Sequence, residues 1–206
     1  MPAFCGGNTG ILACLRLGIL PAAFNPLTNA HLEMARQAVR QYALDEVRFL
    51  LPRVFPHKPY TGASFEQRLE MLRVALAGQA PFSFGTTGAG LFLEIARECR
   101  RIYGPETRFY ILCGRDAAER IVNWDYGDLP SFARQLQEFQ MLVAPRGGPY
   151  AAPGEFAGRI HHLDLAPELE ACSASAVREA IAGGQSWEHL VPPPVADIIR
   201  RHRLYC

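Results

Sequence analysis

Short apolar segments that alternate with segments of helical periodicity constrain the fold of this chain more than any other feature. Strands are predicted at residues 12–20, 47–54, 107–113 and 139–144, and more weakly at 161–165. Most of these segments are continuously apolar, which is typical of strands covered on both faces. The sequence therefore predicts a sheet buried between two layers.

Helices are predicted between and after these strands, at residues 29–43, 64–77, 90–103, 175–182 and 193–202. In the first of them, Leu32, Ala35 and Val39 recur at spacings of three and four and form one apolar face. Strands that alternate with helices pair in parallel through crossover connections. We therefore expect an α/β fold with a doubly wound parallel sheet and a small helical part at the C-terminal end.

The length of 206 residues suits one domain, which we assign to residues 11–206 after a flexible, glycine-rich N-terminal lead-in at 1–10. No apolar run approaches the roughly 20 residues that span a bilayer. The first ten residues carry no basic side chain, so a signal peptide is not expected either.

Charge and cysteine usage narrow the classes of function. With 21 basic and 20 acidic residues the net charge is +1, which argues against a nucleic-acid-binding module. An anionic ligand would therefore need a local cluster of donors. Six cysteines occur without a Cys-x-x-Cys pair, which favours a reducing cytoplasm over a disulfide framework or a metal site.

The loop between the first predicted strand and the first predicted helix carries Asn25, Thr28 and His31. Ligands of doubly wound sheets bind beyond the carboxyl ends of the strands. The N–H groups at the start of the following helix, with their partial positive charge, favour an anion there. One interpretation is a phosphate site without a glycine-rich P-loop. The other is a capped loop with an incidental surface histidine.

A second cluster, Ser173, Ser175 and Arg178, opens the helix predicted at 175–182. It offers two hydroxyl groups and the backbone N–H groups of a helix start. The guanidinium of Arg178 lies one turn further on, on the side of Ser175, and this group matches phosphate oxygens in a bidentate way. Two helix N-termini of this kind suit a polyphosphate.

These two clusters, in this order and separation, resemble the nucleotidyltransferase superfamily marked by a [His/Thr]-x-Gly-His motif and an Ile-Ser-Ser-Thr-x-x-Arg motif. Here the motifs stand as Thr-Asn-Ala-His at 28–31 and Cys-Ser-Ala-Ser-Ala-Val-Arg at 172–178. Within the superfamily, the chain is most similar to the nicotinate or nicotinamide mononucleotide adenylyltransferases, over residues 17–205. The resemblance implies a Rossmann-like nucleotidyltransferase fold.

Further matches support the narrower resemblance. Pro-His-Lys-Pro at 56–59 is similar to the family's Pro-His-Lys loop, and Gly-Arg-Asp at 114–116, followed by Trp124, is similar to its Gly-x-Asp…Trp segment. Arg-Gly-Gly at 146–148 resembles an Arg-Pro-Gly turn, and residues 190–205 resemble the family's C-terminal tail.

The chain departs from the family pattern at three places. Pro21 and Ala22 stand where the family usually has two glycines, and Ala30 replaces the motif glycine. Residues 86–91 stand in place of a Ser-Tyr-Thr-x-Asp-Thr-Leu segment that helps to bind the pyridine nucleotide. A proline has no N–H to donate, and a methyl group crowds a backbone that approaches a substrate. These departures bear on acceptor identity and on activity.

The resemblance implies transfer of the adenylyl group of ATP to a pyridine mononucleotide, with Mg²⁺ accompanying ATP and pyrophosphate released. Catalytic contacts to phosphates are expected from His31, Thr28, Arg178 and Lys58. Other ATP contacts are expected from Phe24, Asn25, Gly114, Asp116, Ser173 and Ser175. Contacts to the acceptor are expected from Trp124 and Arg146.

Each assignment has a purely structural alternative: an exposed helical arginine for Arg178, a solvated lysine for Lys58, a helix cap for Asp116 and a core residue for Trp124. At the level of function, pantetheine-phosphate adenylyltransferase is the nearest alternative. A non-catalytic nucleotide-binding protein with the same fold is the alternative from another class. A homo-oligomer stays open beside a monomer, and nicotinate stays open beside nicotinamide mononucleotide.

Overall fold

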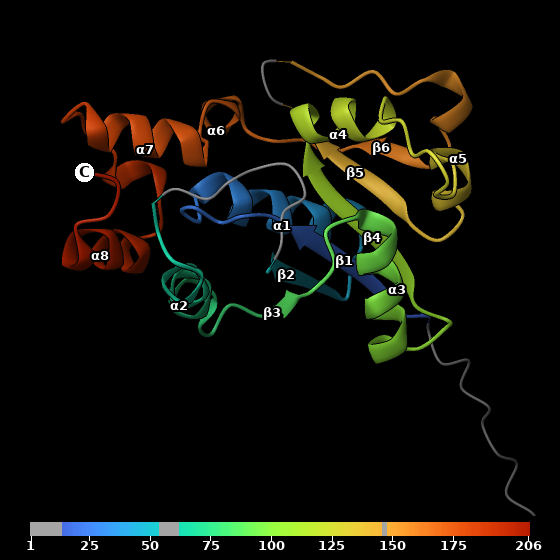
Figure 1. Ribbon diagram of the computed structural model, residues 1–206, viewed down its shortest axis with the longest axis horizontal. Coiled ribbons are helices and arrows are strands. Elements are labelled where there is room, and N and C mark those ends of the chain that lie inside the picture. Colours follow the sequence, from blue (N-terminus) through green and yellow to red (C-terminus); the bar gives the residue numbers. More distant parts are fainter. Residues whose placement is uncertain (1–13, 54–61, 146–147) are drawn as a thin grey trace, which may run out of the picture.

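The computed structural model describes residues 14–53, 62–145 and 148–206, and Figure 1 shows one sheet flanked by helices. The strand order is β3-β2-β1-β4-β5-β6, and every neighbouring pair is parallel. The order reverses between β1 and β4, so the predicted doubly wound sheet is confirmed. The strands are β1 (Arg16–Pro21), β2 (Glu46–Pro52), β3 (Phe82–Thr87), β4 (Arg108–Gly114), β5 (Gln140–Ala144) and β6 (Ile160–His162).

The five predicted helices are confirmed as α1, α2, α3, α7 and α8, with ends shifted by no more than two residues. The α-helices are α1 (Asn29–Tyr42), α2 (Phe65–Leu76), α3 (Phe92–Tyr103), α4 (Arg115–Val122), α5 (Phe132–Gln135), α6 (Pro167–Glu170), α7 (Ala174–Ala182) and α8 (Pro193–His202). Two single 3₁₀ turns are η1 (Gly154–Phe156) and η2 (Glu188–Leu190). In the described part of the chain, no helix has the length and apolar character needed to cross a membrane.

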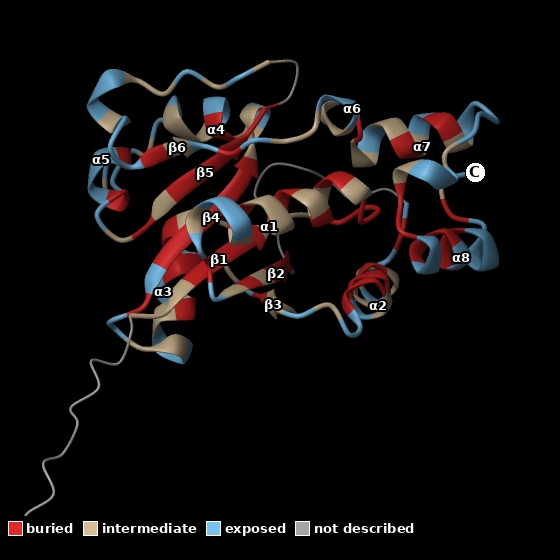
Figure 2. Ribbon diagram, turned by 180° about the vertical axis from the view of Figure 1, so that it is seen from behind, coloured by how far each residue is buried: buried red, intermediate tan, exposed pale blue. Residues whose placement is uncertain are grey.

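Two apolar cores explain why the strand segments do not alternate in polarity. In β1, Leu17 and Ile19 pack on the side of α3 and α4, whereas Leu20 packs on the side of α1. In β4, Ile111 and Leu112 divide between the two sides in the same way. Both faces of the sheet are therefore apolar, as a parallel sheet requires, and Figure 2 shows the buried residues concentrated along its strands and the inner sides of the helices.

The helical part at the C-terminal end consists of α6, α7 and α8. Val195, Ile198 and Ile199 of α8 belong to the same core as Met71 and Leu72 of α2. Figure 1 shows α7 and α8 at one end of the molecule, on the α1 and α2 side of the sheet. This arrangement brings the C-terminal end of the chain close to the loops around α1.

The structure also contains elements that the sequence pattern does not predict. β3 is an edge strand whose sequence, Phe-Ser-Phe-Gly-Thr-Thr, is of mixed polarity, and only its last residue is fully buried. α4 begins directly after β4 without a connecting loop, and only Ala118 of this helix is buried. β6 occupies Ile160–His162 rather than 161–165. The lead-in predicted at 1–10 lies outside the described residues.

Candidate active site

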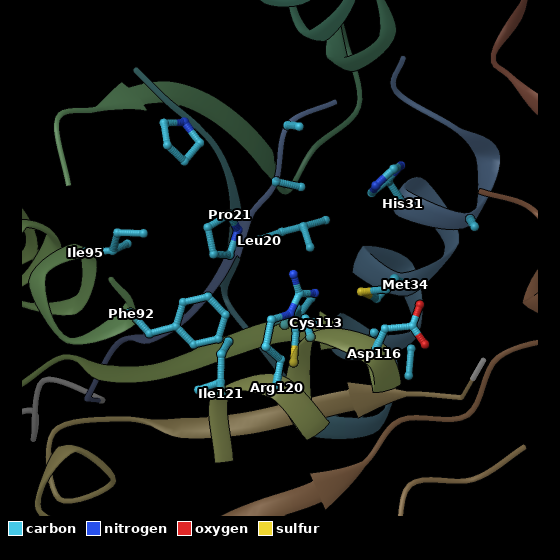
Figure 3. A pocket seen from close by; sticks show the side chains of 18 of the residues that line it. Leu20, Pro21, His31, Met34, Phe92, Ile95, Cys113, Asp116, Arg120 and Ile121 are labelled. Atoms are coloured by element: carbon cyan, nitrogen blue, oxygen red, sulfur yellow. The ribbon is translucent and has the colours of Figure 1, made fainter. Parts of the chain in front are cut away.

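A cavity of about 420 Å³ lies at the carboxyl ends of β1 and β4, where the strand order reverses. Its walls come from the end of β1, the first turns of α1 and α4, and the start of α3 (Figure 3). Ligands of open α/β sheets bind at such switch points. The cavity therefore lies where the sequence predicts a ligand.

His31 lies in the first turn of α1 and lines this cavity (Figure 3). The backbone N–H of Thr28 donates to Nδ1 of His31 at 3.1 Å, and the hydroxyl oxygen of Thr28 lies 2.7 Å from the same nitrogen. Because Nδ1 accepts a hydrogen bond, the neutral imidazole carries its proton on Nε2. The ring therefore offers an N–H donor in an orientation fixed by Thr28.

Thr28 itself is completely buried and does not line the cavity. It precedes α1 in an extended conformation, and its carbonyl accepts from the N–H of His31 at 3.1 Å. The predicted contact of Thr28 with phosphate stays a prediction. Its contacts in the structure indicate that Thr28 orients the imidazole ring of His31.

The β1–α1 loop approaches the cavity through an unusual backbone conformation at Phe24. This residue has a φ of 45°, in the left-handed region, which costs about 1–2 kcal/mol for a residue other than glycine. Its ring is 1% exposed and packs edge-on against His31, with centroids 5.3 Å apart, and against Phe49. Phe24 does not line the cavity, and its predicted contact with ATP stays a prediction.

Two arginines from distant helices hold the carbonyl groups of this loop. Arg68 of α2 donates to the carbonyl of Ala23 at 3.2 Å, and Arg178 of α7 donates to the carbonyl of Asn25 at 2.7 Å. Arg178 also donates to the hydroxyl of Ser175 at 3.1 Å. Arg178 therefore joins the starts of α1 and α7, the two clusters that the sequence predicts to act together.

The side chain of Asn25 anchors the same loop to two other segments of the chain. Its Oδ1 accepts from the hydroxyl of Tyr205 at 2.8 Å and from the backbone N–H of Ala63 at 3.3 Å. Asn25 is 6% exposed and does not line the cavity. Its predicted contact with ATP stays a prediction, and its side-chain oxygen ties the loop to the segments before α2 and after α8.

The second predicted cluster forms the start of α7. Ser173 caps the helix, because its hydroxyl oxygen accepts from the N–H of Ala176 at 3.0 Å. Ser175 is exposed one residue into the helix. The preceding Cys172 lines the cavity, so α7 begins at its rim. The predicted phosphate contacts of Ser173 and Ser175 fit this position and stay predictions.

The third group of predicted residues comes from α4. Gly114 precedes the helix, Asp116 lies in its first turn, and both line the cavity together with Trp124. Trp124 is 41% exposed, which excludes the alternative of a core tryptophan. The structure thus brings Gly114, Asp116 and Trp124 to the same cavity as His31.

Several residues of the cavity are not among those that the sequence singles out. Phe92 and Ile95 of α3 and Ile121 of α4 form an apolar wall, and Met34 lies below His31 on α1 (Figure 3). Arg120 of α4 also lines the cavity. A prediction of α4 would have found Arg120, because it follows Asp116 by four residues and so shares its helical face.

Among the described residues, Cys113 is one of two cysteines that line the cavity, beside Cys172. Burial raises the pKa of the Cys113 thiol to about 12. The thiolate is the nucleophilic form of cysteine. Covalent catalysis through Cys113 is therefore disfavoured.

Comparison with known proteins identifies the family. The profile described as Cytidylyltransferase-like matches residues 19–180, more than half of the chain. A protein from Geobacter sp. (strain M21) named "Probable nicotinate-nucleotide adenylyltransferase" is 31% identical, and the match covers 93% of this chain and 98% of that protein. A protein of the same name from Synechococcus sp. (strain JA-3-3Ab) is 34% identical, over 92% of this chain and 94% of that one. The chain belongs to the nicotinate-nucleotide adenylyltransferase family.

Solved structures of the family share the fold. The nicotinic acid mononucleotide adenylyltransferase of Plasmodium falciparum, complexed with NaAD, superposes with a TM-score of 0.75 over 93% of this chain and 97% of that one. The sequence identity is 16%, so this likeness concerns the fold alone. The predicted Rossmann-like nucleotidyltransferase fold is confirmed.

The departures from the nicotinate-nucleotide adenylyltransferase pattern lie in the walls of the cavity. Pro21, Ala22 and Ala30 all line it, and so do Gly90 and Leu91 from the altered segment before α3. The cavity stays open with these residues in place.

Two predicted site residues of this family member, Lys58 and Arg146, lie outside the described residues. Their contacts with phosphate and acceptor stay predictions. Both follow strands that end near the cavity, since β2 ends at Pro52 and β5 at Ala144.

Proposed function

We propose that this protein transfers the adenylyl group of ATP to the phosphate of nicotinate mononucleotide, forming the dinucleotide and pyrophosphate in NAD biosynthesis. The observation that carries the proposal is the arrangement of His31. It lies at the N-terminus of α1, lines the switch-point cavity and has its Nε2 proton set by Thr28. A donor held there is suited to oxygens of a phosphate in transfer.

The reaction needs no general base from the protein. The acceptor phosphate is largely ionised near neutral pH, with a second pKa of about 6. One of its oxygens forms a bond to the α-phosphorus of ATP, while the bond from that phosphorus to the bridging oxygen breaks. The bridging oxygen keeps the electron pair and leaves with pyrophosphate. Catalysis then depends on alignment and on neutralising charge.

Groups at the starts of α1 and α7 stabilise the negative charge of the phosphates in this proposal. Nε2 of His31 donates to oxygens of the α- and β-phosphates in this proposal. The β- and γ-phosphates lie toward the start of α7, near Ser173, Ser175 and Arg178, with Lys58 as a further cation. Arg178 supports both ends, because it also holds the carbonyl of Asn25 beside His31.

The acceptor base occupies the part of the cavity between Trp124 and the wall of Phe92 and Ile95. Trp124 offers a large exposed ring face there, and aromatic rings stack on one another with a gain of about 0.5–1.5 kcal/mol. Asp116, in the first turn of α4, lies on the side of the cavity where His31 lies (Figure 3) and contacts the nucleoside of ATP in this proposal.

Mg²⁺ enters with ATP in this proposal. Among the residues that the structure describes, no three His, Cys, Asp or Glu side chains are grouped to hold a metal ion. Mg²⁺ suits such a site, because it keeps several waters and binds through substrate phosphates with few protein ligands. The ion supplies charge neutralisation, and the chain's own groups orient the phosphates. We place the reaction in the cytoplasm, where the five described cysteines, none of them paired, would stay reduced.

The test is pyrophosphate release by the full chain with Mg-ATP and, in separate reactions, nicotinate mononucleotide, nicotinamide mononucleotide and phosphopantetheine. The proposal expects the highest kcat/KM with nicotinate mononucleotide. Turnover with phosphopantetheine alone would identify another transferase. ATP binding without turnover of any acceptor would identify a non-catalytic nucleotide-binding protein, and Pro21 and Ala30 would be the residues to revert to glycine first.

A further inference from the structure

The cavity has one strongly basic side chain among its described lining residues, Arg120 on α4. Figure 3 shows this side chain reaching from α4 toward the middle of the cavity, between the side of His31 and Asp116 and the side of Phe92. No residue in the described ranges makes a hydrogen bond or ion pair with its guanidinium. A permanent cation is thus presented to the space that a substrate would occupy.

The other arginine of α4 is placed quite differently. Nε of Arg115 donates to Oε1 of Glu119 at 2.6 Å, and Arg115 lies near Gly148 and lines a second pocket with Tyr150. Arg115 does not line the cavity. The two arginines of α4 thus differ in position: Arg120 faces the cavity, and Arg115 does not.

Arg120 lines the cavity together with Trp124, the proposed stacking partner of the acceptor base. α4 ends at Val122, and the backbone N–H of Trp124, two residues further on, donates to the carbonyl of Ile121 at 3.3 Å. Within α4, Asp116 precedes Arg120 by four residues and shares its face. Along the chain, the order of these cavity-lining groups is carboxylate, guanidinium and indole. We therefore expect the guanidinium to lie close to the ring that would stack on the pyridine.

The charges in the cavity favour a cation for an acceptor with an anionic ring substituent. Among the described residues, the carboxylates of Asp116 and Glu170 line the cavity, and Oε2 of Glu170 accepts from the N–H of Gly148 at 3.3 Å. A carboxylate on the pyridine would be repelled by them and would lose water against the apolar wall. A guanidinium binds a carboxylate through two parallel N–H···O bonds, and such charge-assisted bonds are roughly twice as strong as hydrogen bonds between neutral groups.

We propose that Arg120 pairs with the carboxylate of the nicotinate ring and makes this protein select nicotinate over nicotinamide mononucleotide. The inference rests on the proposed function and identifies the guanidinium of Arg120 as the group that determines which mononucleotide is the acceptor. Nicotinamide mononucleotide has a neutral amide at this position and gains no ion pair. Arg120 is thus a specificity-determining residue that touches the acceptor and takes no part in bond making.

The test measures kcat/KM for nicotinate mononucleotide and for nicotinamide mononucleotide, at saturating Mg-ATP, in the wild type and in Arg120→Gln. Loss of a charge-assisted hydrogen-bonded pair should lower kcat/KM for nicotinate mononucleotide about tenfold to a hundredfold, mainly through KM. The value for nicotinamide mononucleotide should stay within about threefold of wild type. The ratio of the two values is then the diagnostic quantity.

Arg115→Gln is the matched control, because it makes the same substitution on the same helix outside the cavity. It should leave the ratio unchanged. Arg120→Lys keeps the charge without the bidentate geometry and should give an intermediate ratio. Arg120→Glu should move the preference toward nicotinamide mononucleotide beyond the value for Arg120→Gln.

Equal losses with both acceptors in Arg120→Gln would overturn the inference, because they would place the guanidinium on a phosphate that the two acceptors share. An unchanged ratio with unchanged activity would overturn it as well. Absence of turnover with either mononucleotide in the wild type would be a different result, since it contradicts the proposed function itself before any variant is considered.

Discussion

The hydroxyl of Tyr205 donates to Oδ1 of Asn25 at 2.8 Å, so the segment after α8 is tied to the loop that carries His31. Burial raises the pKa of the Tyr205 hydroxyl, which therefore stays protonated and acts as a donor. The same loop is held by Arg68 and Arg178 through its carbonyl groups. The position of the proposed transition-state donor thus depends on side chains from α2, α7 and the segment after α8.

Tyr205→Phe tests this dependence, because it removes one hydrogen bond and keeps the ring. We expect kcat/KM for ATP to fall roughly fivefold, the equivalent of a net hydrogen bond of about 1 kcal/mol. Tyr42→Phe is the matched control, since the hydroxyl of Tyr42 donates to the carbonyl of His162 away from the cavity. The measurement is kcat/KM for ATP in both variants by steady-state kinetics. Equal values in the two variants would refute a role of Tyr205 in positioning the loop.

Gly62→Ala should disturb the same contact from the other side. Gly62 has a φ of +103°, and a Cβ there would lie 2.7 Å from a ring carbon of Tyr205. We expect a loss of unfolding free energy of about 2–4 kcal/mol from strain and overpacking together. Gly78→Ala is the control, because Gly78 has a φ of +71° but no atom near its Cβ position. Denaturant titration should show the larger loss for Gly62→Ala, and equal losses would show that the ring of Tyr205 gives way.

Ser173→Ala should weaken the start of α7. Its hydroxyl accepts from the N–H of Ala176 at 3.0 Å, and loss of such a cap costs about 1 kcal/mol. Ser131→Ala offers a comparison, because Ser131 precedes α5 without a side-chain capping bond. Chemical denaturation should therefore separate the two variants. If Ser173 also binds phosphate, as predicted, only Ser173→Ala should raise KM for ATP.

The sequence predicts the elements whose signals are local and misses those set by distant contacts. The stripe of Leu32, Ala35 and Val39 identifies α1, and the polar residues before it locate the cavity. The bond between Tyr205 and Asn25 joins residues 180 positions apart, and no local pattern encodes such a contact.

Arg120 shows the other way in which a site residue escapes prediction. α4 starts at the residue after β4 ends and has eight residues, fewer than the roughly 10–12 over which a helical pattern is recognised. Without that helix, Asp116 and Trp124 are two motif residues and Arg120 is an unremarkable charge between them. Once the helix is known, the spacing of four residues joins Arg120 to Asp116, and the cavity brings both together with Trp124.

The stability of the fold should depend on pH through His161 of β6. Burial, and after it the nearby Arg159, lowers the pKa of this imidazole below its ordinary 6.5. The unfolded chain then binds the proton more readily than the folded chain, so the contribution of neutral His161 is complete above pH 6.5 and is lost as pH falls toward the lowered pKa. Nε2 of His161 lies 2.8 Å from Oε1 of Gln140.

Unfolding free energies of the wild type and of His161→Gln, measured from pH 7.5 to 5, check this expectation. Glutamine cannot gain the proton, so the stability of the wild type relative to the variant should decrease as pH falls. A difference that stays constant over this range would mean that His161 titrates alike in the folded and unfolded chains.

The most direct test of the central claim is the single-turnover rate of adenylyl transfer in wild type and His31→Ala, with Mg-ATP and nicotinate mononucleotide both saturating. ATP affinity is measured alongside by calorimetry. Removal of one preorganised donor to the transition state should lower the rate about 10²- to 10³-fold and change the Kd for ATP by less than about tenfold. A rate within threefold of wild type, in a variant that folds and binds ATP, would contradict the role of His31 and the mechanism built on it.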